Sequence, residues 1–351
     1  MKTVKTISKA LIILCLQLGL IACKKTEKKY SAYLELQKDT LTSETQIFTS
    51  DPNILKFNIK NIDQHPPKGL NIELIKYGYK FLTTTSRYVG YVVSNPKKRY
   101  AGNNLACVNC HISGGTKAYA GSWIGVMSSY PAYRTKNGKV NDIYMRINGC
   151  MERSMNGRPL EKDSKEMQGV VEYFRWLNTD KKLNYLPQYK GFLKIDLPKR
   201  AADTIKGKAL YNKECFYCHG TNGSGIFFDD RNVSKGYVYP PLWGKQSYNL
   251  GAGMAKLGTL AGFIKGNMPY GVEANDPKIS DEDAYDIAAY VNTKQRPSPP
   301  DLEQDYPDRL TKGADIPYGP YDDIFPEIQH RIGPLQPIKR YYLQQLKERK
   351  K

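Results

Sequence analysis

Two copies of the pattern Cys-x-x-Cys-His contain the residues most suited to chemistry: residues 107–111 read CVNCH and residues 215–219 read CFYCH. This spacing is typical of covalent haem c attachment, in which the two thiols bind the haem vinyl groups and the histidine binds the iron. A structural zinc site would need four ligands, and a disulfide would not need the histidine. We therefore expect two covalently bound haem c groups. Their predicted attachment and iron-binding residues are Cys107, Cys110, His111, Cys215, Cys218 and His219.

A Met-Pro pair in the loop GNMPYG, residues 266–271, offers a second iron ligand for the second haem. Met268 follows His219 by 49 residues, in a loop punctuated by Gly and Pro. A thioether is a soft, neutral ligand that raises the reduction potential, which suits electron transfer. Core packing is the alternative role for this methionine, and Met254 and Lys265 are the alternative ligands.

The first haem motif has no Met-Pro pair after it, which makes Cys150 a candidate ligand. Cys150 follows His111 by 39 residues, and a thiolate is a strong metal ligand. A buried structural cysteine and an intermolecular disulfide remain the alternatives. His65 and His330 lie in proline-flanked or tail segments, where we expect surface roles. The methionines of this part of the chain are Met127, Met145, Met151, Met155 and Met167.

Amphipathic helical patterns surround both motifs and must position them. Segments 70–85 and 202–215 carry such a pattern before the motifs, and segments 166–179 and 281–294 carry it after them. We therefore predict a mainly α fold with two cytochrome c-like helical domains related by duplication, and a linker over about 184–202. The predicted boundaries are 1–22 for a lipoprotein signal peptide, 23–69 for a tether and N-terminal extension, 70–190 for the first domain, 203–296 for the second, and 297–351 for an irregular, proline-rich C-terminal strap.

The first residues have the features of a bacterial export signal. Lys2, Lys5 and Lys9 precede the apolar stretch LIILCLQLGLIA, which is short for a membrane span. It runs into LIAC, residues 20–23, which is similar to the bacterial lipobox, where the cysteine is lipidated. We expect a mature chain anchored through lipidated Cys23 on the periplasmic side of a bacterial membrane. An ordinary signal, or an uncleaved anchor, is the alternative.

The chain has 53 Lys and Arg residues against 34 Asp and Glu residues, a formal net charge of +19. In an exported protein this charge does not predict a nucleic-acid partner, although in a cytosolic protein it would. Small anions, acidic redox partners and lipid head groups are the partners that the charge favours. A merely solubilising charge is the alternative.

Segment 140–157 would place three functional groups on one helix face. Arg146, Cys150 and Ser154 are spaced i, i+4 and i+8, so a helix would align them. A guanidinium and a hydroxyl would then flank the sulfur and could hold an anion beside it. Gly149 weakens this helix by about 1 kcal/mol relative to alanine. The alternative role of the arginine is a solvated surface charge.

The segment RINGCMERSMNG, residues 146–157, both haem motifs and the tail GPYDDIFPEIQHRIGPLQPI, residues 319–338, together resemble the dihaem c-type thiosulfate dehydrogenases. The likeness extends over about residues 71–338. It implies oxidation of two thiosulfates to tetrathionate, reversible in some members, with electrons leaving through the second haem to a redox partner such as a small cytochrome c or another acceptor. It also implies that His111 and Cys150 bind the iron of the first, catalytic haem, and it places Arg134 in the pocket.

The resemblance has two further implications for individual residues. The family mechanism implies that Cys150 leaves the iron transiently and takes up a thiosulfate as an S-linked adduct. Some members have a lysine immediately before the methionine of the Met-Pro pair, where this sequence has Asn267. That difference favours plain ligation by His219 and Met268 over ligand switching by a neighbouring lysine.

These residues favour a thiosulfate dehydrogenase, or a tetrathionate reductase, over a non-catalytic dihaem electron carrier. Joining two dianions requires fixed positive charge that offsets their repulsion. The two arginines that flank the thiolate would supply this positive charge. An electron carrier has no need of such an arrangement. The predicted catalytic residues are Cys150, Arg134, Arg146 and Ser154.

Overall fold

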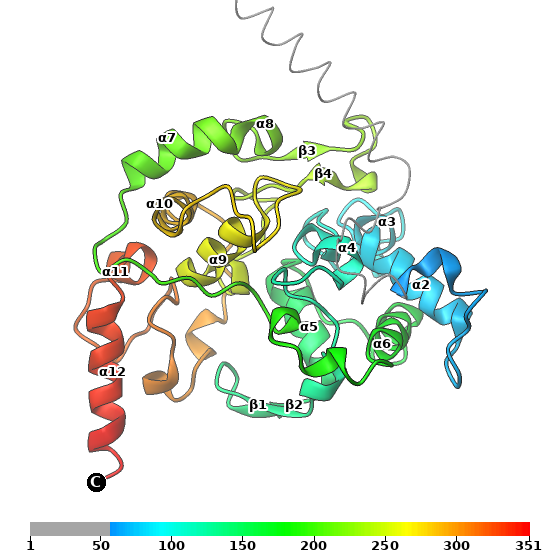
Figure 1. Cartoon of the computed structure of the whole chain (residues 1–351), viewed down its shortest axis with the longest axis horizontal. Coiled ribbons are helices and arrows are strands. Elements are labelled where there is room, and N and C mark those ends of the chain that lie inside the picture. The colour runs from blue at the N-terminus through cyan, green and yellow to red at the C-terminus, as the bar shows by residue number, and fades with distance from the viewer. Residues whose placement is uncertain (1–56) are drawn as a thin grey trace, which may run out of the picture. The chain divides into compact units, whose positions relative to one another are not determined.

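The computed structural model describes residues 57–351 (Figure 1). The predicted signal peptide, Cys23 and the tether as far as residue 56 lie outside the described residues. Within residues 57–351, no helix is both long enough and apolar enough to span a bilayer.

The first domain is built around the crossing of two amphipathic helices. Asn71 begins α2, because its side-chain oxygen accepts a hydrogen bond from the Leu74 amide at 3.0 Å. At the crossing with α6, a Cβ on Gly78 would collide with the carbonyl of Gly169, so glycine permits the close approach. The helices of this domain are α2 (Ile72–Thr83), α3 (Thr85–Val89), α4 (Ile112–Gly115), α5 (Ile143–Arg153) and α6 (Lys165–Leu177).

The second domain repeats this crossing. Here α7 crosses α10, and a Cβ on Gly207 would collide with the carbonyl of Asp286. The second haem motif follows α7 directly, whereas an inserted stretch separates α2 and α3 from the first motif. The predicted pair of helical domains is therefore confirmed. The helices of the second domain are α7 (Thr204–Glu214), α8 (Phe216–His219), α9 (Leu257–Asn267) and α10 (Asp281–Asn292).

Strands are few among the described residues. β1 (Ala132–Arg134) pairs antiparallel with β2 (Lys139–Asn141), with Ala132 opposite Asn141. β3 (Ile226–Phe227) pairs antiparallel with β4 (Tyr237–Tyr239). The first hairpin leads directly into α5, so it carries Arg134 toward the helix that contains Arg146 and Cys150. The mainly α fold class is confirmed.

Two hydrophobic cores correspond to the two domains, and they share an interface. The first core includes Ile75 and Leu177, and the second includes Leu257 and Tyr285. Ile112, directly after the first haem motif, packs within the second core. Segment 184–202 also packs onto the domains: Tyr189 is buried in the first core, and Phe192 contacts Phe263 with 5.8 Å between ring centroids.

The C-terminal tail is irregular only as far as Pro326. Two helices follow, α11 (Glu327–Ile332) and α12 (Gln336–Glu348) (Figure 1). Ile338 and Tyr342 are four residues apart and both are buried in the second core, which explains why α12 forms despite its polar composition. The sequence did not predict this helix.

The surface role predicted for His330 is wrong. Its side chain is fully buried, its Nδ1 lies 2.9 Å from the carbonyl of Ala314, and its ring stacks on Tyr321 at 3.8 Å between centroids. His65, in contrast, is exposed as expected.

Candidate functional site

The two motif histidines are both held with one ring nitrogen toward a backbone carbonyl. His111 Nδ1 lies 2.5 Å from the carbonyl oxygen of Gly121, and His219 Nδ1 lies 2.8 Å from that of Pro240. A carbonyl can only accept, so Nδ1 carries the proton and Nε2 keeps a free lone pair. This is the tautomer that a metal-binding imidazole needs.

Four of the five cysteines among residues 57–351 have raised pKa values. Burial raises the pKa of the Cys107, Cys110 and Cys215 thiols to about 12, and it also raises that of Cys218. All five cysteines are free of disulfides. The motif cysteines are therefore neutral thiols, available to become thioethers to a haem.

Cys150 is the exception. Burial raises the pKa of its thiol, but the charge of Arg146 and the neighbouring His111 outweigh this effect and lower the pKa to about 6. Arg146 Nη1 donates a hydrogen bond to Cys150 Sγ at 2.7 Å, one turn away along α5. The interaction with His111 means that the thiol lies beside the motif histidine, so these two residues could both hold a haem iron.

Tyr130 joins the two arginines of the predicted pocket. Its hydroxyl accepts a hydrogen bond from Arg134 Nη2 and also pairs with the guanidinium of Arg146. The Arg134 guanidinium lies 4.8 Å from the centroid of the Tyr130 ring. The structure thus brings Arg134, Arg146 and Cys150 together. The sequence reasoning missed Tyr130, whose only signal was its position four residues before Arg134.

Ser154 lies at the C-terminal end of α5. Its amide donates to the carbonyl of Cys150 at 2.8 Å, and its carbonyl accepts from the side chain of Asn103 at 3.0 Å. Both of these hydrogen bonds are made by the backbone of Ser154 and not by its hydroxyl. The predicted role of its hydroxyl stays a prediction.

Met268 ends α9 and packs, half-buried, against the second core. The alternatives to it are occupied elsewhere: Lys265 forms an ion pair with Asp281 at 2.8 Å, and Met254 is buried within the core. Asn267 is fully buried, and its side-chain nitrogen donates to the carbonyl of Tyr119 in the first domain at 3.2 Å. Because Asn267 is fixed in this way, the backbone position of its neighbour Met268 is fixed as well.

The loop that carries Met268 is also tied to the first domain on its other side. The Lys117 ammonium donates to the carbonyl of Val272 at 2.6 Å and lies 3.8 Å from the Glu273 carboxylate. Lys117 follows His111 by six residues. The segment that follows the first haem motif is thus joined to the loop that carries Met268.

A buried arginine at the end of the second domain also fits a haem. Arg296 is 9% exposed and forms no ion pair with another described residue. It donates to the carbonyls of Leu242 and Val291 and lies 4.4 Å from the centroid of the Tyr248 ring. A buried cation without a counter-charge is costly, and a haem propionate could supply that charge. The thiols, the histidines and this arginine together fit haem c.

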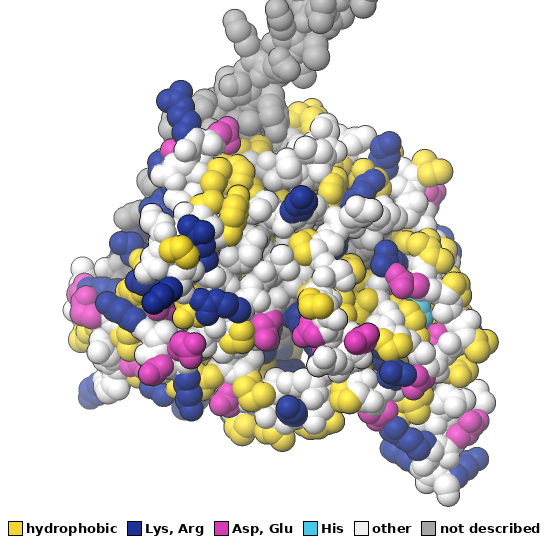
Figure 2. Space-filling model, turned by 180° about the vertical axis from the view of Figure 1, so that it is seen from behind, with side chains coloured by type: hydrophobic (Ala, Val, Ile, Leu, Met, Phe, Trp, Pro, Cys, Tyr) yellow, Lys and Arg dark blue, Asp and Glu magenta, His cyan; other side chains and the backbone are white. Residues whose placement is uncertain are grey.

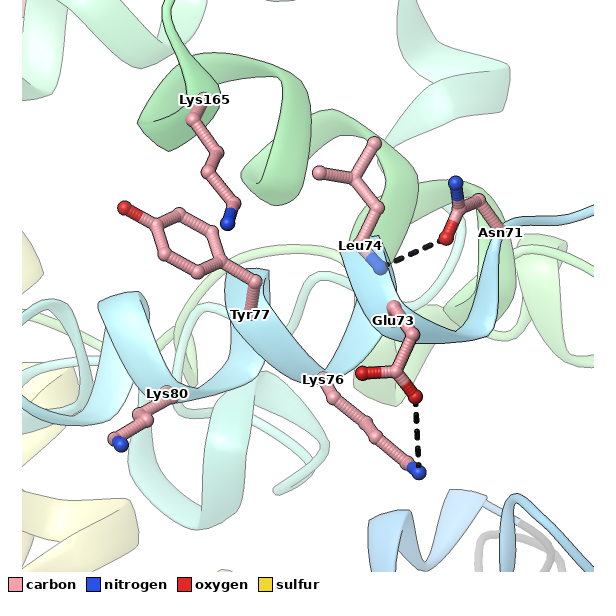
Figure 3. A pocket seen from close by; sticks show the side chains of 7 residues that line it. All are labelled: Asn71, Glu73, Leu74, Lys76, Tyr77, Lys80 and Lys165. Atoms are coloured by element: carbon pink, nitrogen blue, oxygen red, sulfur yellow. Dashed lines mark hydrogen bonds and ion pairs between the residues drawn. The ribbon is translucent and has the colours of Figure 1, made fainter.

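A surface hollow between α2 and α6 lies outside this group of residues (Figure 3). Its lining contains no cysteine or histidine. Two of its lysines have partners: Lys165 Nζ lies 4.4 Å from the centroid of the Tyr77 ring, and Lys76 pairs with Glu73 at 3.4 Å. We assign no chemistry to it.

Charged side chains of both signs are interspersed on the face shown in Figure 2. Several basic residues of the described chain are neutralised locally, as Arg200 is by Asp286 at 2.7 Å.

The fold and the two motif sites define a c-type cytochrome with two haem c groups, each in its own cytochrome c domain. Residues 97–180 match the family described as SoxA/TsdA, cytochrome c domain, and residues 205–295 match the family Cytochrome c. The predicted cofactors are therefore confirmed.

The chain belongs to the thiosulfate dehydrogenase family, as the sequence predicted. It is 38% identical over 230 residues to the thiosulfate dehydrogenase of Stutzerimonas stutzeri, covering 66% of this chain and 70% of that protein. It is 41% identical over 206 residues to that of Psychrobacter arcticus, covering 59% of this chain and 61% of that protein. The solved thiosulfate dehydrogenase TsdBA of Marichromatium purpuratum is 30% identical, with a TM-score of 0.60 over 74% of this chain and 53% of that one.

Proposed function

We propose that this protein joins two thiosulfate ions into one tetrathionate ion and releases two electrons. The observation that carries the proposal is the Cys150 sulfur, which accepts a hydrogen bond from Arg146 at 2.7 Å and faces His111. A low-pKa thiolate beside a guanidinium is a nucleophile in a site suited to anions. Membership of the thiosulfate dehydrogenase family supports the same substrate.

Fixed positive charge is the main contribution of the arginines. Two unit charges 4 Å apart repel by about 4 kcal/mol at an effective dielectric constant of 20, and each thiosulfate carries two charges. In our proposal Arg134 and Arg146 bind the sulfonate oxygens and offset this repulsion. Cys150 Sγ would form an S–S bond to the outer sulfur of one thiosulfate as two electrons pass to the acceptor. The second thiosulfate would then attack that outer sulfur, releasing tetrathionate and the Cys150 thiolate. The Ser154 hydroxyl, four residues after Cys150, is proposed to assist in orientation.

Electrons leave toward the second domain. Haem c supplies the acceptance and transfer of single electrons. Ile112 of the first motif region packs in the second core, and Lys117 and Asn267 bridge the domains, so the chain holds the two motif regions in a fixed relation. His219 and Met268 are the proposed ligands on the exit side. Because the same arginines would bind tetrathionate, the proposal includes the reverse reaction.

We further propose that the protein is exported and anchored through lipidated Cys23 on the periplasmic side of a bacterial membrane. The sequence LIAC at residues 20–23 supports this location. A redox partner such as a small cytochrome c or another periplasmic acceptor would receive the electrons.

The test is dye-coupled oxidation of thiosulfate by the purified holoprotein, with tetrathionate quantified as the product. The proposal predicts one tetrathionate formed for every two electrons accepted by the dye. A non-catalytic electron carrier would exchange electrons with the dye but would form no tetrathionate, and that result would overturn the proposal.

A further inference from the structure

Tyr130 occupies a position between two guanidinium groups that come from different elements. Arg134 stands at the end of β1 and Arg146 on α5, and the Tyr130 hydroxyl interacts with both. Arg146 in turn donates to Cys150. An unbroken series of side-chain contacts therefore runs from Arg134 through Tyr130 and Arg146 to the sulfur.

We propose that Tyr130 is a positioning residue that holds Arg134 and Arg146 as one cradle for the sulfonate end of thiosulfate. The proposal rests on the proposed function, because it concerns substrate binding at the same site. The ligand class is a sulfur oxyanion, whose oxygens suit the paired donors of guanidinium groups.

The difference in exposure between Arg134 and Tyr130 explains why a positioning residue is needed. Arg134 is exposed, and a long exposed side chain loses rotamer entropy when it is fixed. The Tyr130 ring is half-buried and packs against the first core, so the fold determines its position. A phenol fixed in this way can align two flexible guanidinium groups before the substrate arrives.

The chemistry of the phenol also suits this role. A hydroxyl oxygen can accept two hydrogen bonds and still donate one. With the Arg134 guanidinium donating to its oxygen, the Tyr130 hydroxyl can still donate its own proton to an anion in the cradle. The ring also lies against Arg134, 4.8 Å from its guanidinium carbon. A phenylalanine would keep this ring contact and lose only the hydroxyl.

The closing experiment measures thiosulfate binding to the reduced holoprotein by titration calorimetry, where no electron can be accepted and turnover cannot occur. Tyr130→Phe should weaken binding by about 10-fold or more, the scale for losing hydrogen bonds to charged groups. The matched control is Tyr133→Phe on the same hairpin, because Tyr133 is 62% exposed. It should bind as the wild type does.

A double-mutant cycle tests whether Tyr130 acts by positioning Arg134 or only by contacting thiosulfate itself. If Tyr130 acts through Arg134, then Arg134→Ala should cost less in the Tyr130→Phe background than in the wild type. Unchanged binding in Tyr130→Phe, or fully additive losses, would overturn the proposal. A wild-type protein that binds thiosulfate but never forms tetrathionate would contradict the proposed function and leave the cradle standing. A wild-type protein that binds no thiosulfate would overturn the cradle.

Discussion

Arg146 and Cys150 are joined by a hydrogen bond from Nη1 to Sγ of 2.7 Å across one turn of α5. The same contact makes the charge of Arg146 the main influence that counters burial and lowers the pKa of the thiol. One residue therefore both stabilises the thiolate and offers positive charge to an incoming anion.

Replacing Arg146 should reduce catalysis and leave the haems attached. Arg146→Ala should lower kcat/KM for thiosulfate by about 100-fold or more, the scale for losing a charge-stabilising donor. Arg146→Lys should rescue poorly, because an ammonium lacks the planar fork of the guanidinium. The measurement is dye-coupled turnover beside haem content. Exposed Arg87 gives a matched control as Arg87→Ala. Normal turnover in Arg146→Ala would mean that the anion site has been misplaced.

Met268 should control the second haem. Met268→Ala should remove the far-red absorption of a ferric haem with a methionine ligand and should lower the potential of that haem, because the thioether stabilises the reduced iron. Redox titration with optical detection checks both effects. Lys265→Ala, which removes only the ion pair with Asp281, should leave both unchanged. An unaltered spectrum in Met268→Ala would transfer the ligand role to Met254 or Lys265.

Cys23 should determine where the protein is found in the cell. Cys23→Ser should release it from the membrane fraction into the soluble fraction, because acylation supplies the anchor. Fractionation with intact-mass measurement checks this, and the wild type should show two haem additions and an acylated N-terminal cysteine. A wild-type mass that includes the two haems but no lipid would contradict the proposed lipid anchor.

Lys312 should make stability depend on pH above neutrality. It is 2% exposed, and burial lowers the pKa of its ammonium from 10.5 to about 8. Below about pH 8 the folded state contains a costly buried charge. Between about pH 8 and pH 10.5 the unfolded state binds more protons, so stability rises with pH. Burial raises the pKa of the surrounding Tyr306, Tyr318 and Tyr321, which therefore stay neutral.

The measurement for Lys312 is guanidinium-induced unfolding of wild type and Lys312→Met on both sides of about pH 8. The wild type should gain stability relative to the variant as the pH rises. Exposed Lys339→Met is the control and should show no such change. An equal difference between wild type and Lys312→Met at both pH values would show that Lys312 does not titrate in this range.

Much of the fold could be predicted because the decisive signals are local. Apolar residues at helical spacing predicted α6 and α10, and the i, i+4 spacing predicted the contact of Arg146 with Cys150. Segments in which the apolar periodicity is weak were harder to predict. The helix α12 follows a proline-rich stretch, and only two of its residues, Ile338 and Tyr342, are buried in the core.

Contacts between distant residues could not be predicted from one sequence. Lys117 reaches Val272 across 155 positions, and no local pattern marks either residue as part of an interface. Tyr130 reaches Arg146 from a loop whose direction depends on packing against the first core. His330 was expected at the surface because its segment is irregular, yet the pocket that buries it is built from Ala314, Tyr321 and Asp323.

We propose that Cys150 takes part in the chemistry as well as binding the iron. A neutral methionine would suffice for moving electrons, so a low-pKa thiolate at this position indicates a second use. Cys150→Gly should keep both haems, because the four motif cysteines are untouched, and should alter the ferric spectrum of the first haem alone while abolishing turnover. Cys150→Gly is the reference with which the variant Cys150→Met is compared.

The most direct measurement is the rate of thiosulfate oxidation by Cys150→Met holoprotein with both haems attached. Methionine can occupy the sixth position on the iron but offers no nucleophilic sulfur. The account predicts wild-type haem content, a changed ferric spectrum at the first haem and no detectable tetrathionate. Thiosulfate oxidation at the wild-type rate would contradict it, because Cys150 would then only tune the iron.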